Sequence, residues 1–215
     1  MKTKWDDLTV ADQLRMKEIG ELQVATDDEK NMMVAALLAE IPYNQVLMMP
    51  LSDVRSIMDN TEFLLHKPTA VKARRKYEIN GTVYKLFKDP SEMTVAQYFD
   101  FQAVHKQGYE NMPGEMLSIF LIPEGHQYND GYDKEKQLED MLSMSVTEAL
   151  GVVDFFTRRC LKLIGRMKTF CKTLLKVERL RAPKEQKEAL KALELETSLI
   201  MDALTEEYSS LVLKQ

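Results

Sequence analysis

The sequence predicts an α+β protein that is predominantly α-helical, with a small central β-hairpin packed on helices and a long C-terminal antiparallel helical hairpin. Helix N-cap signals and proline breaks recur through the first 120 residues, and one Asn-Gly pair lies between alternating segments. The last third holds two long amphipathic stretches separated by an Ala-Pro pair. We therefore expect a helical domain at residues 1–142, with the hairpin at about 76–88, and a long helical hairpin at residues 143–215.

The first two helices are marked by residues that cap helix N-termini. Thr9, followed by an acid three positions later, predicts a helix that extends to about Gln23. Thr26 and Glu29 form a capping box, in which each side chain accepts a hydrogen bond from the backbone of the other residue. The residues that follow are apolar on nearly all sides, so this second helix should be buried until Pro42 ends it.

The sequence pattern changes from helical to alternating after a third helix. Pro50 precedes this helix, and apolar residues at helical spacing carry it to about Leu64. Residues 76–87 alternate between apolar and polar side chains and contain Asn80-Gly81. Asn-Gly favours a two-residue turn in which both residues have positive φ, so these residues predict a β-hairpin.

Two helices and a loop follow the hairpin. Thr94 predicts the N-cap of a helix at residues 95–107, and a further helix should extend from about Asn111 to about Leu121 with a proline in its first turn. Residues 123–133 (PEGHQYNDGYD) are rich in turn-forming residues and predict a loop.

The C-terminal third predicts two long helices joined by a short turn. Ser145 and Glu148 form another capping box, which opens a helix that extends to about Leu180. Residues 182–183 (Ala-Pro) break it, and a last helix should span about 184–212. The residues of this last helix at three-and-four spacing are Leu190, Leu193, Thr197, Ile200, Leu204 and Leu211.

One side of the first of these long helices is strongly basic. At about 100° per residue, seven cations fall on this side, while apolar residues gather on the other. The cations are Arg158, Lys162, Arg166, Lys168, Lys172, Lys176 and Arg179. They form either a solvated face that pairs with acids of the same chain, or a binding surface for an acidic protein or for phosphate groups.

The predicted loop contains candidate contact residues but no recognised metal motif. His126, Tyr128 and Asp130 lie in it, yet counting back from Gly131 does not give the ligand spacing of an EF-hand. The loop is either a surface loop tied by its own turns or a contact for a partner. No zinc, P-loop, dinucleotide or hydrolase motif occurs in the sequence, so we expect no cofactor, no metal and no enzymatic activity.

Composition limits the remaining possibilities. The formal net charge of −5 disfavours nucleic-acid binding by the whole molecule, and two cysteines, Cys160 and Cys171, are too few for a disulfide framework. We expect both thiols to be buried. No apolar stretch approaches the roughly 20 residues of a membrane span, and no signal peptide is evident. The 14 methionines fill gaps in a core or line a groove that accepts apolar helices.

The middle of the chain carries a series of short motifs. They are YEINGTVY (77–84), DPSEMT (89–94), AQYFDF (96–101), IFLIPEGH (119–126) and YNDGYD (128–133). This series, within residues 77–156, resembles small proteins of tailed phages and prophages of the tail assembly chaperone type.

The resemblance implies a non-enzymatic role in virion morphogenesis, by binding the helical tape-measure protein and keeping it soluble until the tail tube polymerises. It also implies a location in the host cytoplasm during assembly. The helices outside the matched region leave open a structural or adaptor protein of the tail, neck or packaged set, which would be located in the virion. A nucleic-acid-binding regulator that uses the basic helix is a third alternative. Oligomerisation is compatible with each of these roles.

Overall fold

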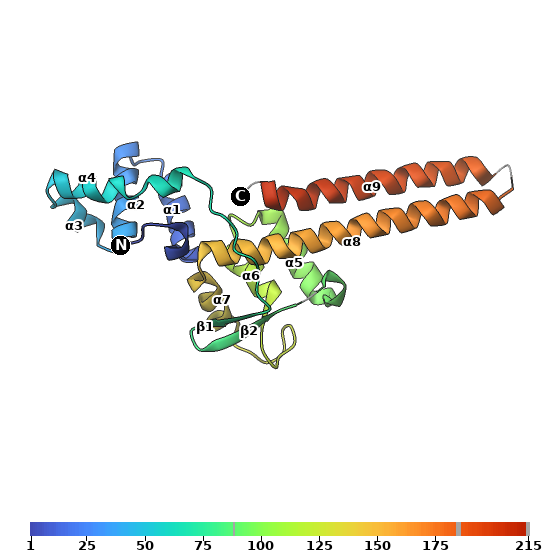
Figure 1. Cartoon of the computed structure of the whole chain (residues 1–215), viewed down its shortest axis with the longest axis horizontal. Helices are drawn as coiled ribbons and strands as arrows, with labels where there is room; N and C mark the ends of the chain where they lie inside the picture. The colour runs from blue at the N-terminus through green and yellow to red at the C-terminus, as the bar shows by residue number, and fades with distance from the viewer. Residues whose placement is uncertain (88, 184–185, 214–215) are drawn as a thin grey trace. The chain divides into compact units, whose positions relative to one another are not determined.

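The computed structural model describes residues 1–87, 89–183 and 186–213, and it is an α+β protein in which helices predominate (Figure 1). The chain forms two compact units. Among the described residues, the first unit takes 1–87 and 94–152, and the second takes the rest. The division falls inside a long helix at residues 152–153, whereas the boundary expected from the sequence precedes that helix, at residues 142–143.

Residues 10–59 form four α-helices at the start of the first unit. These are α1 (Val10–Glu21), α2 (Asp27–Ala39), α3 (Tyr43–Leu47) and α4 (Leu51–Asp59). The predicted N-cap at Thr9 and the predicted capping box at Thr26 are both present, and Thr9 also forms a capping box with Asp12. The short helix α3 was not predicted, because Pro42 was interpreted only as a helix stop. The fixed φ of Pro42 instead makes it the N-cap of α3. The predicted third helix ends at Asp59, and a 3₁₀ turn at Glu62–Leu65 follows.

A three-stranded antiparallel sheet with the order β1-β2-β3 contains the predicted hairpin. β1 (Lys76–Ile79) pairs with β2 (Thr82–Leu86), and the turn residues Asn80 and Gly81 have φ of 48° and 77°. The positive φ values confirm the predicted Asn-Gly turn. The third strand, β3 (Leu121–Pro123), was not predicted, because an apolar run this short carries no alternation that would distinguish it from the end of a helix.

Three helices of the first unit pack around one another and the sheet. α5 (Val95–Gln107) contacts α6 (Pro113–Phe120), and α6 contacts α7 (Lys134–Ser143). The side chains of α6 are mostly buried, including Met116, Leu117 and Phe120. Helix α7 was not predicted, because its inward positions include the polar residues Gln137 and Asp140 and so break the apolar periodicity.

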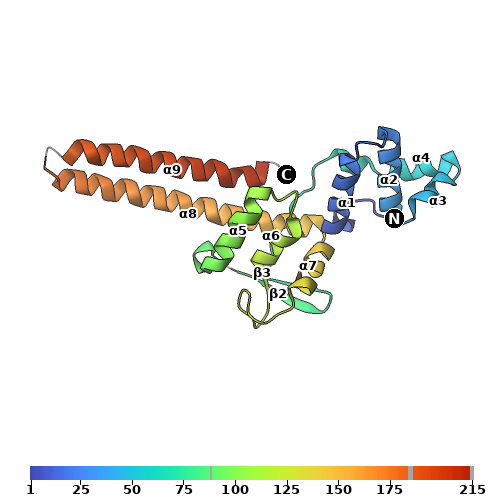
Figure 2. The same cartoon turned by 180° about the vertical axis from the view of Figure 1, so that it is seen from behind.

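The second unit is dominated by two long helices that lie side by side and antiparallel (Figures 1 and 2). α8 (Val146–Arg181) begins in the first unit, and α9 (Lys187–Leu213) follows the predicted Ala182-Pro183 break. The start expected for the last helix, at Lys184, lies outside the described residues. Within the described residues, no helix combines the length and the apolar character needed to cross a membrane.

Candidate functional site

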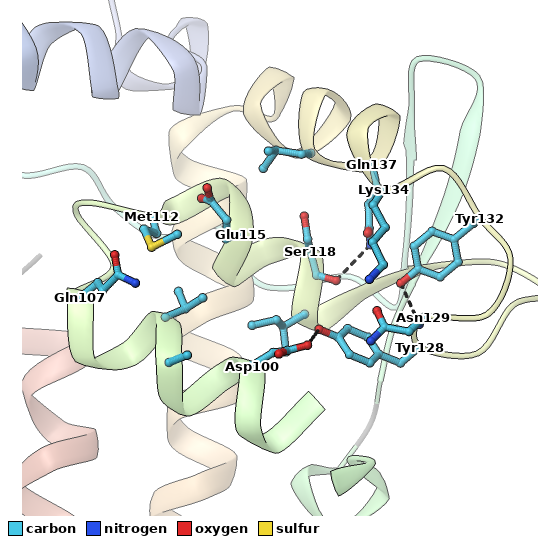
Figure 3. Close-up of a pocket in the computed structure, with 14 residues that line it drawn as sticks. Asp100, Gln107, Met112, Glu115, Ser118, Tyr128, Asn129, Tyr132, Lys134 and Gln137 are labelled. Atoms are coloured by element: carbon cyan, nitrogen blue, oxygen red, sulfur yellow. Dashed lines mark hydrogen bonds between the residues drawn. The ribbon is translucent and has the colours of Figure 1, made fainter. Parts of the chain in front are cut away.

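A pocket of about 350 Å³ opens in the first unit among α5, α6, α7 and the loop at residues 124–133 (Figure 3). Each helix contributes residues from one of its faces. The α5 residues Asp100, Ala103, Val104 and Gln107 follow a spacing of three, four and seven. The remaining lining residues are Met112, Glu115, Ser118, Ile119, Tyr128, Asn129, Tyr132, Lys134, Gln137 and Leu138.

The loop is held against the pocket by hydrogen bonds. The Tyr128 hydroxyl donates to the Asp100 carboxylate at 2.6 Å and so ties the loop to α5 (Figure 3). The Asn129 backbone N–H donates to the Tyr132 hydroxyl at 3.3 Å, with Asn129 in the left-handed region at φ 63°. These bonds place two tyrosine rings at the mouth of the pocket.

Two buried amide side chains bind the end of helix α6, which lines part of the pocket. The Gln137 Nε2 of α7 donates to the carbonyl oxygens of Ser118 at 3.0 Å and Leu121 at 2.7 Å. On the other side, the Gln97 Nε2 of α5 donates to the carbonyl oxygen of Ile119 at 3.1 Å. A helix leaves its last carbonyl groups without partners inside the helix, so the two glutamines satisfy the end of α6. The junction between α6 and β3 is therefore anchored from both neighbouring helices.

The chemistry of the pocket is that of an apolar cavity with a polar rim. Ala103, Val104, Met112, Ile119 and Leu138 supply apolar surface. Burial raises the pKa of Tyr128, and the hydrogen bond to Asp100 raises it further. Tyr128 is therefore a neutral hydrogen-bond donor at all physiological pH values. Such a site suits an apolar group flanked by polar ones.

Tyr128 is the one residue of the predicted loop set that lines this pocket. The other two lie nearby in the exposed part of the loop, where the His126 Nδ1 lies 3.0 Å from the Asp130 carbonyl oxygen. The His126 ring also packs edge-on against Tyr132, with centroids 5.8 Å apart. No cluster of three or more potential metal ligands occurs in the part of the chain that the structure describes.

The predicted basic face lies on α8 in the second unit, and three of its seven cations form ion pairs. Arg158 pairs with Asp154, Lys168 pairs with Asp202 of α9, and Arg179 approaches Glu194 of α9 at 3.3 Å. The four exposed cations without a described ion pair are Lys162, Arg166, Lys172 and Lys176. Some cations of this face therefore contact α9, and the others are exposed to solvent.

The cysteines differ from each other in burial. Cys160 is buried, and this burial raises the pKa of its thiol to about 12. Cys171 is only half-buried, so the prediction of two buried thiols is wrong for this residue. It lies at a position of α8 where the side chain is only partly covered.

Most of the pocket residues could not be identified from the sequence. Asp100 and Tyr132 lie within the motifs that carry the family resemblance, and membership of these motifs was the one feature of the sequence that could have indicated them. Lys134, Gln137 and Leu138 belong to the unpredicted helix α7, so no pattern indicated that they would face α5. Comparisons of the chain with models of protein families, with curated proteins and with solved structures returned no match.

Proposed function

We propose that this protein is a non-enzymatic phage assembly factor of the tail assembly chaperone type, which binds a helical segment of the tape-measure protein. One observation carries the proposal: three of the motifs that carry the family resemblance contribute residues to the pocket. Asp100 comes from the AQYFDF motif, Ile119 from IFLIPEGH, and three loop residues from YNDGYD. Three motifs spread over residues 96–133 therefore contribute to one cavity.

The size and lining of the pocket suit an apolar side chain presented by a helix. A volume of about 350 Å³ lies at the lower end for ligand pockets, so it accommodates one or two side chains rather than a large cofactor. An amphipathic helix presents such anchors at three-and-four spacing. Tyr128 and Tyr132 at the mouth offer the rigid amphipathic surface that is common in protein interfaces.

Four of the 14 methionines lie in the buried interior. Met116, Met141, Met144 and Met201 are buried and pack within the two units. Met112 lines the pocket, where its unbranched side chain can adapt to different apolar groups. The proposed contact with the client therefore depends on one methionine of the pocket rather than on a surface rich in methionine.

The test is co-expression of the full chain with the tape-measure protein encoded by the same genome. The wild-type chain should keep that client in the soluble fraction and co-purify with it. Ala103→Trp places an indole in the pocket from α5 and should abolish the complex. Ala96→Trp is the matched control, because Ala96 is exposed on the same helix and does not line the pocket.

Three results would overturn the proposal. These are a client that stays insoluble, a complex that Ala103→Trp leaves intact, and a complex that Ala96→Trp disrupts equally. Mass spectrometry of purified particles supplies an independent measurement. An assembly chaperone should be missing from mature virions, whereas a structural or adaptor protein would be detected in them.

A further inference from the structure

The two helices of the second unit contact each other through positions spaced three and four residues apart, which are less exposed than their neighbours. In α8 these positions are Ile164, Lys168, Cys171, Leu175 and Arg179. In α9 they are Leu190, Glu194, Thr197, Met201, Leu204 and Tyr208. The ion pairs Lys168–Asp202 and Arg179–Glu194 join the helices and define the antiparallel register.

The residues of α9 that contact α8 differ in part from those predicted by the spacing of the last helix. Leu190, Thr197 and Leu204 face α8 as the pattern predicted, but Leu193 and Ile200 are exposed. Positions 194, 201 and 208 face α8 instead of 193, 200 and 207. Met201 and Tyr208 are buried against α8, whereas the predicted spacing would have placed the glutamate at position 207 there. The described side chains end before the predicted Leu211.

Leu193 and Ile200, which do not face α8, belong to a second apolar surface, which we call the apolar side face. Its members are Met167, Phe170, Leu174 and Val177 of α8 with Leu193 and Ile200 of α9. Their exposed fractions range from 36% to 67%. The α8 members repeat at intervals of three and four residues, as core positions of helical bundles do. A row of this kind is typical of a helix packed on two sides rather than one.

Both helices direct these residues to the same side of the pair. At about 100° per residue, the α8 members are centred about 120° from the positions that face α9, and the α9 members about 70° from those that face α8. Both rotations have the same sense about each helix's own axis. Because the helices run antiparallel, these rotations bring the two sets together on one side.

The apolar side face lies between a basic helix and an acidic one. From residue 162 to 181, α8 carries Lys162, Arg166, Lys168, Lys172, Lys176, Arg179 and Arg181 against a single acid, Glu178. From residue 187 to 209, α9 carries Glu188, Glu194, Glu196, Asp202, Glu206 and Glu207 against Lys187 and Lys191. By helical geometry, Arg166 of α8 and Glu196 and Glu207 of α9 flank this face on its outer sides, so a partner on it meets a positive charge along one edge and negative charges along the other.

We infer that a second copy of this chain covers the apolar side face, related by a two-fold axis parallel to the helices. This arrangement places α8 of each copy over α9 of the other, so the basic edge meets the acidic edge on both sides. The result is a four-helix bundle in which neighbouring helices are all antiparallel. A two-fold axis across the helices would instead place α8 on α8 and oppose like charges.

Sedimentation equilibrium of the full-length protein tests this inference, which does not depend on the proposed client. The wild-type chain should be a dimer, and Phe170→Glu should raise the dimer Kd at least about tenfold, because it buries a charge without a partner. Leu195→Glu is the matched control. Leu195 is 63% exposed on α9 and, by the same helical geometry, points away from both α8 and the apolar side face.

Charge reversal tests the orientation of the two copies. Arg166→Glu should raise the dimer Kd, because an acid of α8 then opposes acids of α9 at both helix contacts. Mixing it with the double variant Glu196→Lys with Glu207→Lys should restore dimers, because opposite charges then face each other at both helix contacts. The axis across the helices predicts instead that the first variant alone dimerises as well as the wild type.

A wild-type chain that is monomeric at all concentrations overturns the inference, as does a dimer insensitive to Phe170→Glu. A dimer that keeps its Kd after the reversal of Arg166 overturns the orientation. A monomeric wild type whose complex with the tape-measure protein is lost in Phe170→Glu assigns the face to the client. That last result overturns the dimer and leaves the proposed function standing.

Discussion

At the scale of single residues, Asp140 joins the hairpin to α7. Its carboxylate is almost fully buried and accepts hydrogen bonds from the Tyr84 hydroxyl at 2.6 Å, the Asn80 side-chain amide at 2.9 Å and Lys136 Nζ at 2.8 Å. Burial alone raises the pKa of Asp140, but the bonds from Lys136, Tyr84 and Asn80 more than offset it and hold the pKa below its ordinary value. The folded protein therefore stabilises the charged form of Asp140.

Asp140→Asn should lower the free energy of unfolding by about 1–3 kcal/mol at neutral pH, because the charge that accepts these bonds is lost. The folded pKa is the depressed one, so the stabilisation is complete above the unfolded pKa near 3.9 and disappears as the pH falls below it. Urea unfolding at pH 7 and pH 3 measures this difference. Glu139→Gln removes an exposed carboxylate from the same helix and should change little at either pH. An equal loss for Asp140→Asn at both pH values would contradict the assignment.

At the scale of elements, local signals predicted the sequence-adjacent structure and missed elements defined by distant contacts. The helix at 95–107 depends on hydrogen bonds between residues three or four positions apart, and the Asn-Gly hairpin pairs residues at most nine positions apart, so local residue types identified both. β3 exists because it pairs with β2, some 35 positions earlier in the chain. Helix α7 buries Gln137, whose partners are carbonyl groups of another element. The residue pattern within β3 or within α7 does not indicate that these segments bind such distant parts of the chain.

The same distinction explains the candidate site. Tyr128 was predicted because the loop composition drew attention to its residues, yet its role follows from the bond to Asp100, 28 positions away. The spacing of the cations predicted that they share one side of α8. Its ion pairs with Asp202 and Glu194 required the register of α8 against α9, which spacing within one helix does not determine.

Two glycines of helix α8 should respond in opposite directions to alanine. A Cβ at Gly151 would overlap the Val71 carbonyl oxygen, because the segment before β1 runs against the start of α8, where the Val71 N–H donates to the Thr147 carbonyl oxygen at 3.0 Å. Gly151→Ala should therefore lower the free energy of unfolding by about 2 kcal/mol or more. Gly165 has no neighbour within 4 Å of a Cβ, so Gly165→Ala should raise it by about 0.5–1 kcal/mol. Chemical denaturation of both variants measures these changes, and a neutral Gly151→Ala would exclude the close backbone approach.

At the scale of the whole molecule, the net charge of −5 is unevenly distributed. The second unit has 14 Lys and Arg against 11 Asp and Glu, a net +3, and the first has 15 against 23, a net −8. The cations of α8 are partly neutralised by the acids of α9, with two ion pairs between these helices. The basic helix is thus adjacent to an acidic surface of its own chain, and this disfavours contact with phosphate groups.

We therefore expect the wild-type protein to show no binding to a DNA duplex at about 150 mM salt, measured by fluorescence anisotropy. Neutralising three acids of α9 with Glu194→Gln, Glu196→Gln and Glu206→Gln should produce binding that weakens steeply with salt, because the cations of α8 lose their nearby counter-charges. The matched control makes the same total change in the first unit, with Glu62→Gln, Glu78→Gln and Glu139→Gln, all at exposed positions. If total charge governed binding, the two triple variants would behave alike. If its distribution governs binding, as the pairing of α8 with α9 implies, only the first triple variant binds. Salt-sensitive binding by the wild type itself would support the regulator alternative instead.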